Sequence, residues 1–69
     1  MPEQRFVFTR HALEKMAMLG ISIPQVREAV RRGAKVRQAD GLLASYTYLK
    51  VAYRKAGEGV YKIKTVYVE

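Results

Sequence analysis

The first half of the chain carries apolar residues at the spacing of two short helices. Residues 5–8 come first and alternate as a strand does, with Phe6 and Phe8 on one face. Thr9 is suited to cap the helix that follows, and Gly20 is suited to end it. Over residues 10–19, the apolar stripe that we expect to be buried consists of Ala12, Leu13, Met16, Ala17 and Leu19.

The second helix is predicted by the tetrapeptide "SIPQ" at residues 22–25. Ser22 can cap the helix while Gln25 reaches back to it, and Pro24 lies in the first turn, where its missing N–H costs nothing. Gly33 is the expected end. The expected buried stripe consists of Ile23, Val26, Ala29 and Val30, and the charged residues directed away from it are Arg27, Glu28, Arg31 and Arg32.

The second half has the pattern of strands joined by turns. Asp40 and Gly41 lie between two strand-like runs and predict a hairpin, and "KAGEG" at residues 55–59 predicts another turn. The predicted strands cover residues 35–39, 42–54 and 60–68. The order is therefore β-α-α-β-β-β. It predicts a single α+β domain over residues 1–69, with two helices on one face of a small antiparallel sheet.

Alternation along the last two predicted strands divides their residues between two faces. Thr65 and Tyr67 fall on the helix side by simple alternation, and Val66 and Val68 fall on the polar side. A bulge late in the strand would exchange these two pairs. We expect Leu49, Val51, Tyr53 and Ile63 in the core, and we expect Tyr48, Lys50, Arg54, Lys62 and Lys64 on the open face.

Charge suggests the kind of partner. Thirteen Lys and Arg residues against six Asp and Glu residues give a net charge of +7, which favours a polyanion such as nucleic acid. The open face combines cations with tyrosine rings, a combination that suits single-stranded RNA better than duplex DNA. The alternatives are a surface that is merely charged for solubility, and a solvated face whose lysines discourage pairing between sheet edges.

The chemistry available is limited. The acidic residues are scattered, cysteine is absent and His11 is the single histidine, so we expect no metal site and no cofactor. Cleavage of RNA by its own 2′-hydroxyl group needs no metal, and His11 could then transfer a proton. The alternative is a surface histidine with no role. "MPEQRF" lacks a signal-like apolar core and no apolar run approaches membrane length, so we expect a cytoplasmic protein.

Three motifs carry a resemblance to a known family. "FTRHALEKMAMLGIS" at residues 8–22, "VREAVRRG" at residues 26–33 and "IKTVYVE" at residues 63–69 resemble a family of small prokaryotic domains of unknown function, DUF4258-like. The resemblance covers residues 6–67 and implies a fold similar to that of RelE-type and BrnT-type toxins, which are metal-independent ribonucleases of the barnase–colicin–RelE-like group. Carried over by position, the resemblance implies that the active residues include His11, Thr65, Arg10 and Lys64.

The leading hypothesis is an RNA-directed protein of the toxin type, a metal-independent endoribonuclease. His11 would be the general acid or base, and Thr65 or Tyr67 would orient the phosphate. One alternative is a non-catalytic RNA- or protein-binding module. Another is a component neutralised by an antitoxin-like protein or by a second copy pairing at a sheet edge. The residues expected to bind RNA are Arg10, Tyr48, Lys50, Arg54, Lys62 and Lys64.

Overall fold

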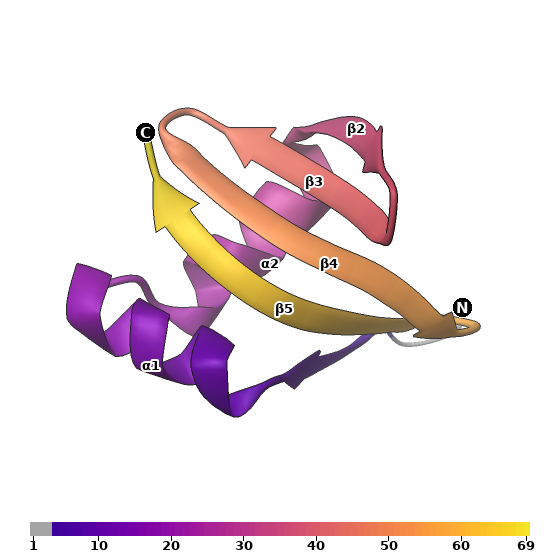
Figure 1. Ribbon diagram of the computed structural model, residues 1–69, viewed down its shortest axis with the longest axis horizontal. Helices are drawn as coiled ribbons and strands as arrows, with labels where there is room; N and C mark the ends of the chain where they lie inside the picture. The colour runs from indigo at the N-terminus through magenta and orange to yellow at the C-terminus, as the bar shows by residue number, and fades with distance from the viewer. Residues whose placement is uncertain (1–3) are drawn as a thin grey trace.

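The computed structural model describes residues 4–69, so residues 1–3 of the N-terminal stretch "MPEQRF" lie outside the described part. Five strands form one sheet in the order β1-β5-β4-β3-β2, and the helices cover one of its faces (Figure 1). The predicted α+β class is confirmed. The elements are β1 (Arg5–Phe8), α1 (Arg10–Leu19), α2 (Ile23–Arg32), β2 (Ala34–Gln38), β3 (Gly41–Tyr46), β4 (Leu49–Gly57) and β5 (Val60–Val68).

Strand pairing differs from the prediction in two respects. β1 runs parallel to β5 while all the other pairs are antiparallel, so the sheet is mixed. The single strand predicted over residues 42–54 is two strands, because the chain reverses at Thr47 and Tyr48. Thr47 takes a left-handed conformation, with φ at 56°. Neither residue is a usual turn former, which is why the apolar pattern concealed this turn.

Both helix starts follow the sequence signals. The Thr9 hydroxyl accepts a hydrogen bond from the Ala12 amide at 3.0 Å and donates one to the Lys64 carbonyl oxygen at 3.0 Å. The second bond fixes the beginning of α1 against β5. Ser22 and Gln25 form the predicted capping box, and Gly20 ends α1 in the left-handed conformation. These bonds satisfy backbone N–H groups that a helix end otherwise leaves unpaired.

The core lies between the two helices and the sheet. α1 buries a narrower stripe than predicted, because it packs mainly against β5 near one edge. Leu13, Ala17 and Leu19 are exposed in consequence, and so is Ile23 at the start of α2. All four core predictions for the last strands are confirmed. The buried cluster consists of Ala12, Met16, Val26, Ala29, Val30, Ala44, Leu49, Val51, Tyr53, Ile63 and Val66.

A β-bulge in β5 decides which residues of that strand face the helices. Ala52 pairs with Thr65, and Tyr53 pairs with Ile63, so Lys64 is an extra residue on β5. Beyond the bulge the faces exchange. Val66 enters the core, with 0% of its surface exposed. The prediction that Thr65 and Tyr67 lie on the helix side is therefore wrong, because simple alternation has no place for the extra residue.

Within residues 4–69, neither helix has the length and apolar character that crossing a bilayer requires.

Candidate nucleic-acid interface

Cross-strand pairing brings several of the predicted site residues together on the open face of the sheet. Lys50 pairs with Tyr67, Arg54 pairs with Lys62, and Thr65 occupies β5 between them. Directly opposed residues of an antiparallel pair have Cβ atoms about 5 Å apart. The helices pack against the other face, so this face stays uncovered within the described part of the chain (Figure 1). A polyanionic strand could therefore reach cations, a phenol ring and a hydroxyl group together.

The cations on this face differ in whether a carboxylate lies close enough to offset their charge. Three ion pairs occur among residues 4–69, and one of them joins Lys64 to Asp40. Lys50, Arg54 and Lys62 have no carboxylate within 4.0 Å in the same range. Their charge is therefore available to a phosphate.

Lys64 is held by the turn between β2 and β3. Its Nζ donates to the Asp40 carbonyl oxygen at 2.5 Å and lies 3.4 Å from Asp40 Oδ2. To reach that turn, the side chain extends past β4 toward Gly41, where an added Cβ would lie 3.4 Å from Nζ. Lys64 is thus on the predicted face, but its charge is partly offset by Asp40.

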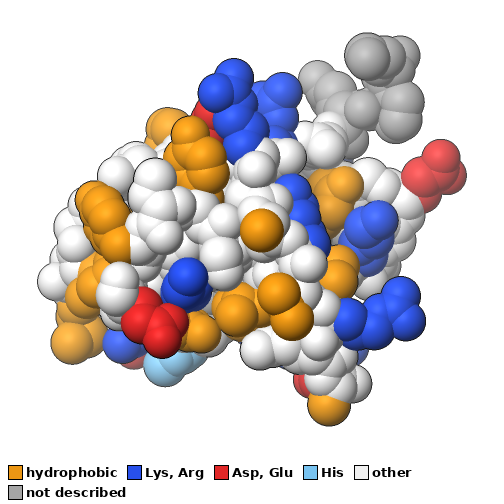
Figure 2. All heavy atoms as spheres, turned by 90° about the horizontal axis from the view of Figure 1, so that it is seen from above, with side chains coloured by type: hydrophobic (Ala, Val, Ile, Leu, Met, Phe, Trp, Pro, Cys, Tyr) orange, Lys and Arg blue, Asp and Glu red, His pale blue; other side chains and the backbone are white. Residues whose placement is uncertain are grey.

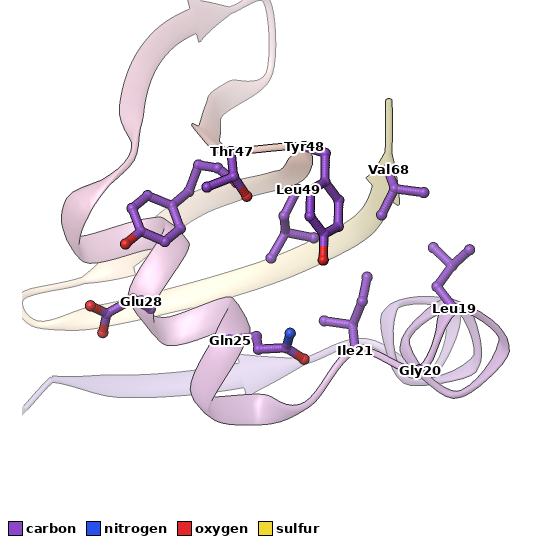
Figure 3. Close-up of a pocket in the computed structure, with 10 residues that line it drawn as sticks. Leu19, Gly20, Ile21, Gln25, Glu28, Thr47, Tyr48, Leu49 and Val68 are labelled. Atoms are coloured by element: carbon purple, nitrogen blue, oxygen red, sulfur yellow. The ribbon is translucent and has the colours of Figure 1, made fainter.

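Tyr48 does not join these cations. It lies in the turn between β3 and β4, with 62% of its surface exposed. There it lines a pocket of about 170 Å³ with Leu49, Val68 and Ile21 (Figure 3). In the close-up, the Tyr48 ring points toward Ile21 and Gln25. The strand break at Thr47 explains the difference, because the face of Tyr48 was predicted from a continuous strand.

Arg10 and His11 are both exposed in the first turn of α1. Arg10 is paired with Glu14, with Nε at 3.5 Å from Oε1. No hydrogen bond joins His11 to Thr65 or Tyr67 in the part of the chain described. The bond from Thr9 to the Lys64 carbonyl nevertheless starts α1 beside the residue that precedes Thr65. The helix start and the bulge of β5 are therefore neighbours, but α1 lies on the helix side of the sheet, whereas Thr65 and Tyr67 lie on the open face.

A second group of cations is absent from the residues expected to bind RNA. Arg31, Lys35 and Lys55 border a hollow on the helix side of the sheet, and Arg37 borders the hollow next to it. Viewed from above, most basic side chains lie over the top and right of the molecule, and apolar ones lie at the left and across the middle (Figure 2). Arg31, Lys35 and Arg37 lie within residues 31–37, and the fold brings Lys55 of β4 to them.

The fold resembles that of a chain in the crystal structure of the toxin–antitoxin complex RelBE2 from Mycobacterium tuberculosis, with a TM-score of 0.67 and 18% sequence identity. The match covers 99% of this chain and 100% of that chain. No protein-family model matches the sequence, and no curated protein sequence matches it either. The resemblance to the DUF4258-like family therefore finds no support in family models. At this identity, the likeness establishes a RelE-like fold for the chain.

Proposed function

We propose that this chain is a toxin-like protein that binds single-stranded RNA on the open face of its sheet. The observation that carries the proposal is the pairing of Lys50 with Tyr67 and of Arg54 with Lys62, on either side of Thr65. The two lysines and the arginine supply charge to neutralise phosphates, and the phenol ring offers stacking to an unpaired base. The RelE-like fold, which a chain of a toxin–antitoxin complex shares, agrees with this function.

The reaction proposed is metal-independent cleavage, in which the 2′-oxygen of the RNA attacks the adjacent phosphorus and the P–O5′ bond breaks. It leaves a 2′,3′-cyclic phosphate end and a 5′-hydroxyl end, so one proton is removed from the 2′-hydroxyl and one is given to the leaving 5′-oxygen. His11 accepts or supplies a proton, because imidazole exchanges protons near neutral pH. Thr65 or Tyr67 orients the phosphate, and Lys50 and Lys62 stabilise the charge that develops on it. The start of α1 is fixed beside the bulge of β5 by the bond from Thr9, which favours a site shared by these two elements.

Cleavage is tested by incubating the protein with a single-stranded RNA in EDTA and analysing the products for 2′,3′-cyclic phosphate ends. The variants are His11→Ala, Thr65→Val and Tyr67→Phe, with Lys15→Gln on α1 as the control. We expect His11→Ala to lower the rate roughly 100-fold or more, the usual size of a general acid–base contribution. A rate equal to that of the wild type would remove His11 from the mechanism. RNA binding without any cleavage would leave a non-catalytic binding module.

A protein partner is the second candidate function, and the arrangement of the sheet favours it. β2 is an edge strand, and all five of its residues, Ala34–Gln38, are exposed. An exposed edge offers backbone N–H and C=O groups to another chain. The chain with a similar fold belongs to a toxin–antitoxin complex, which favours an antitoxin-like partner over a second copy. Sedimentation at several concentrations separates the two, because pairing between copies predicts a concentration-dependent dimer.

A further inference from the structure

The helix side of the sheet holds a hollow that the open-face proposal does not use. It has a volume of about 430 Å³, within the range of small-molecule sites. It lies at the C-terminal end of α2, where the helix no longer covers the sheet. No Asp or Glu is among the residues that line it, which are Gln4, Val30, Arg31, Lys35, Leu42, Tyr53, Lys55 and Tyr61.

Three cations surround this hollow. Arg31 and Lys55 have no carboxylate within 4.0 Å among residues 4–69. Lys35 is held in place, because its Nζ donates to the carbonyl oxygens of Arg31 at 3.2 Å and Gly33 at 2.7 Å. An ammonium group has three N–H donors, so one remains for a ligand. An arginine, two lysines and a lining free of acids favour an anion.

The floor of the hollow is aromatic and carries an unpaired hydroxyl group. Tyr53 is only 2% exposed, yet its hydroxyl group forms no hydrogen bond to another residue in the described part of the chain. No polar side-chain atom in that part is both fully buried and unpaired, so the hydroxyl keeps contact with solvent, and Tyr53 lines this hollow. Burial, and then the neighbouring Tyr61, raise the pKa of Tyr53, so the group is a hydrogen-bond donor at neutral pH.

The rings beneath the cations are firmly packed. Tyr61 stacks on Phe6 with centroids 5.3 Å apart, and Tyr53 meets Tyr61 edge to face at 5.9 Å. Arg27 lies over the Phe6 ring, 5.6 Å from its centroid. These contacts hold the Tyr53 and Tyr61 rings in place before any ligand arrives, which lowers the cost of ordering them on binding.

We propose that this hollow is a second binding site, which holds the phosphate group of a nucleotide-sized ligand. Arg31, Lys35 and Lys55 supply charged donors, and the tyrosine hydroxyls supply neutral ones. So many donors exceed what the two oxygens of a carboxylate need and suit the three free oxygens of a terminal phosphate. The volume leaves room for an attached sugar or base. The phosphate comes from a free nucleotide or from the 5′ end of an RNA strand, and the site does not depend on cleavage at the open face.

The test is a titration of the ¹⁵N-labelled protein followed by backbone amide shifts at constant ionic strength. The probes are inorganic phosphate, adenosine 5′-monophosphate, and one RNA oligonucleotide with and without a 5′-phosphate. We expect saturable shifts at residues 31, 42 and 55 with at least one phosphate-bearing organic probe. Weaker saturation by inorganic phosphate at the same amides would agree with a ligand larger than phosphate. Saturation by the mononucleotide identifies a free nucleotide as ligand, and saturation only by the 5′-phosphorylated RNA identifies the strand end.

Two double variants separate this site from the open face. Arg31→Gln with Lys55→Gln is expected to weaken binding of the responding probe at least about tenfold, as losing charge-assisted hydrogen bonds would. Lys50→Gln with Lys62→Gln removes the same charge from the open face and should change the affinity for the mononucleotide less than about twofold, since a distant charge acts only through a screened field. For the RNA, the quantity compared between variants is the gain in affinity that the 5′-phosphate gives. Tyr53→Phe should weaken binding several-fold, the effect of one neutral hydrogen bond. Each variant is first checked for a native amide spectrum.

Three outcomes would overturn the proposal. The first is no saturable shift with any probe, and the second is the same shift with and without the 5′-phosphate on the RNA and none with the mononucleotide. The third is an equal loss of affinity in both double variants. The last outcome would indicate attraction by net charge alone. Failure of RNA cleavage or of RNA binding at the open face would leave the proposal standing, because the probes and variants report on different residues.

Discussion

The two basic regions of this protein gather positive charge in different ways. On the open face, cross-strand pairing puts Lys50 beside Tyr67 and Arg54 beside Lys62, so the spacing follows the strand register. In the hollow, Arg31 comes from a helix, and Lys55 comes from a strand. The first surface extends along the sheet and can follow a strand of phosphates. The second is concave and suits one phosphate group.

This difference shows why charge alone is a poor guide to a binding site. Both regions contribute to the net charge of +7. The distinguishing features are the groups beside the cations: an accessible phenol ring and Thr65 on one side, and the unpaired Tyr53 hydroxyl on the other. The two regions should act independently, so that a change in one leaves binding at the other unaltered.

The largest effect on stability is expected from deleting Lys64, the extra residue of the bulge. The deletion joins Ile63 directly to Thr65, so simple alternation keeps Val66 in the core and keeps Thr65 and Tyr67 on the open face. It removes the Lys64 carbonyl oxygen that accepts the Thr9 hydrogen bond, and with it the bond that fixes the start of α1 against β5. Leaving such a donor without its partner costs about 1–3 kcal/mol. Urea denaturation followed by circular dichroism should show a lower midpoint than that of the wild type.

Lys64→Ala is the matched control for this deletion. It keeps the number of residues in β5 and removes only the contact with Asp40. The pair is partly exposed, with 30% and 82% of the two side chains accessible, so the loss should be about 1 kcal/mol or less. If the deletion and the substitution proved equally stable, the bond from Thr9 to the backbone of residue 64 would not contribute to stability.

The elements themselves could be predicted from local signals, whereas the bulge could be named only as an alternative to simple alternation. Thr9, Gly20 and the Ser22–Gln25 box act over a few residues, so they predict both helices to within a residue. A bulge depends on how two strands share their hydrogen bonds, which no local pattern encodes. Its one trace in the sequence was the presence of Val66 and Val68 on a supposedly polar face.

The candidate site could be predicted only where it lies along one strand pair. Lys50, Arg54 and Lys62 occupy the predicted face because alternation holds for them. Tyr48 left that face with the turn at Thr47, and Thr65 and Tyr67 reached it only through the bulge. In the hollow, Arg31 and Lys35 are four residues apart in the chain, whereas the proximity of Lys55 to them is a property of the tertiary structure.

The next effect concerns the salt dependence of RNA binding. Lys50→Gln with Lys62→Gln should make the slope of log K against log salt shallower by about 1.4, because each phosphate contact with a single strand contributes about 0.7. Arg31→Gln with Lys55→Gln should leave the slope for an RNA without a 5′-phosphate unchanged. Fluorescence anisotropy at several salt concentrations measures both. Equal changes in the two variants would mean that the RNA does not distinguish the regions.

A smaller effect is expected at Asp40, in the opposite direction. Asp40→Asn removes the carboxylate near Lys64 Nζ, so the lysine charge becomes available to RNA and binding should strengthen a few-fold at low salt. Glu28→Gln is the control, since Glu28 pairs with Arg32 on α2. The same anisotropy assay applies. A similar gain with Glu28→Gln would show that net charge, rather than release of Lys64, strengthens binding.

The smallest effect is an alkaline loss of stability that comes from the hollow alone. The pKa of Tyr53 is raised in the folded protein above its ordinary value of 10.0, through burial and the nearby Tyr61. The folded state therefore holds this proton more tightly than the unfolded state does. This proton's contribution to stability is complete below pH 10 and declines as the pH rises through the folded pKa.

Tyr53→Phe has no such proton, so its stability should fall less steeply than that of the wild type above pH 10. Urea denaturation between pH 8 and pH 11 compares the two. Lysines titrate in the same range but are common to both proteins, so the difference between the curves isolates Tyr53. Parallel curves would place the Tyr53 hydroxyl in a more water-like setting than the hollow requires, and the donor assigned to the phosphate would then lose its support.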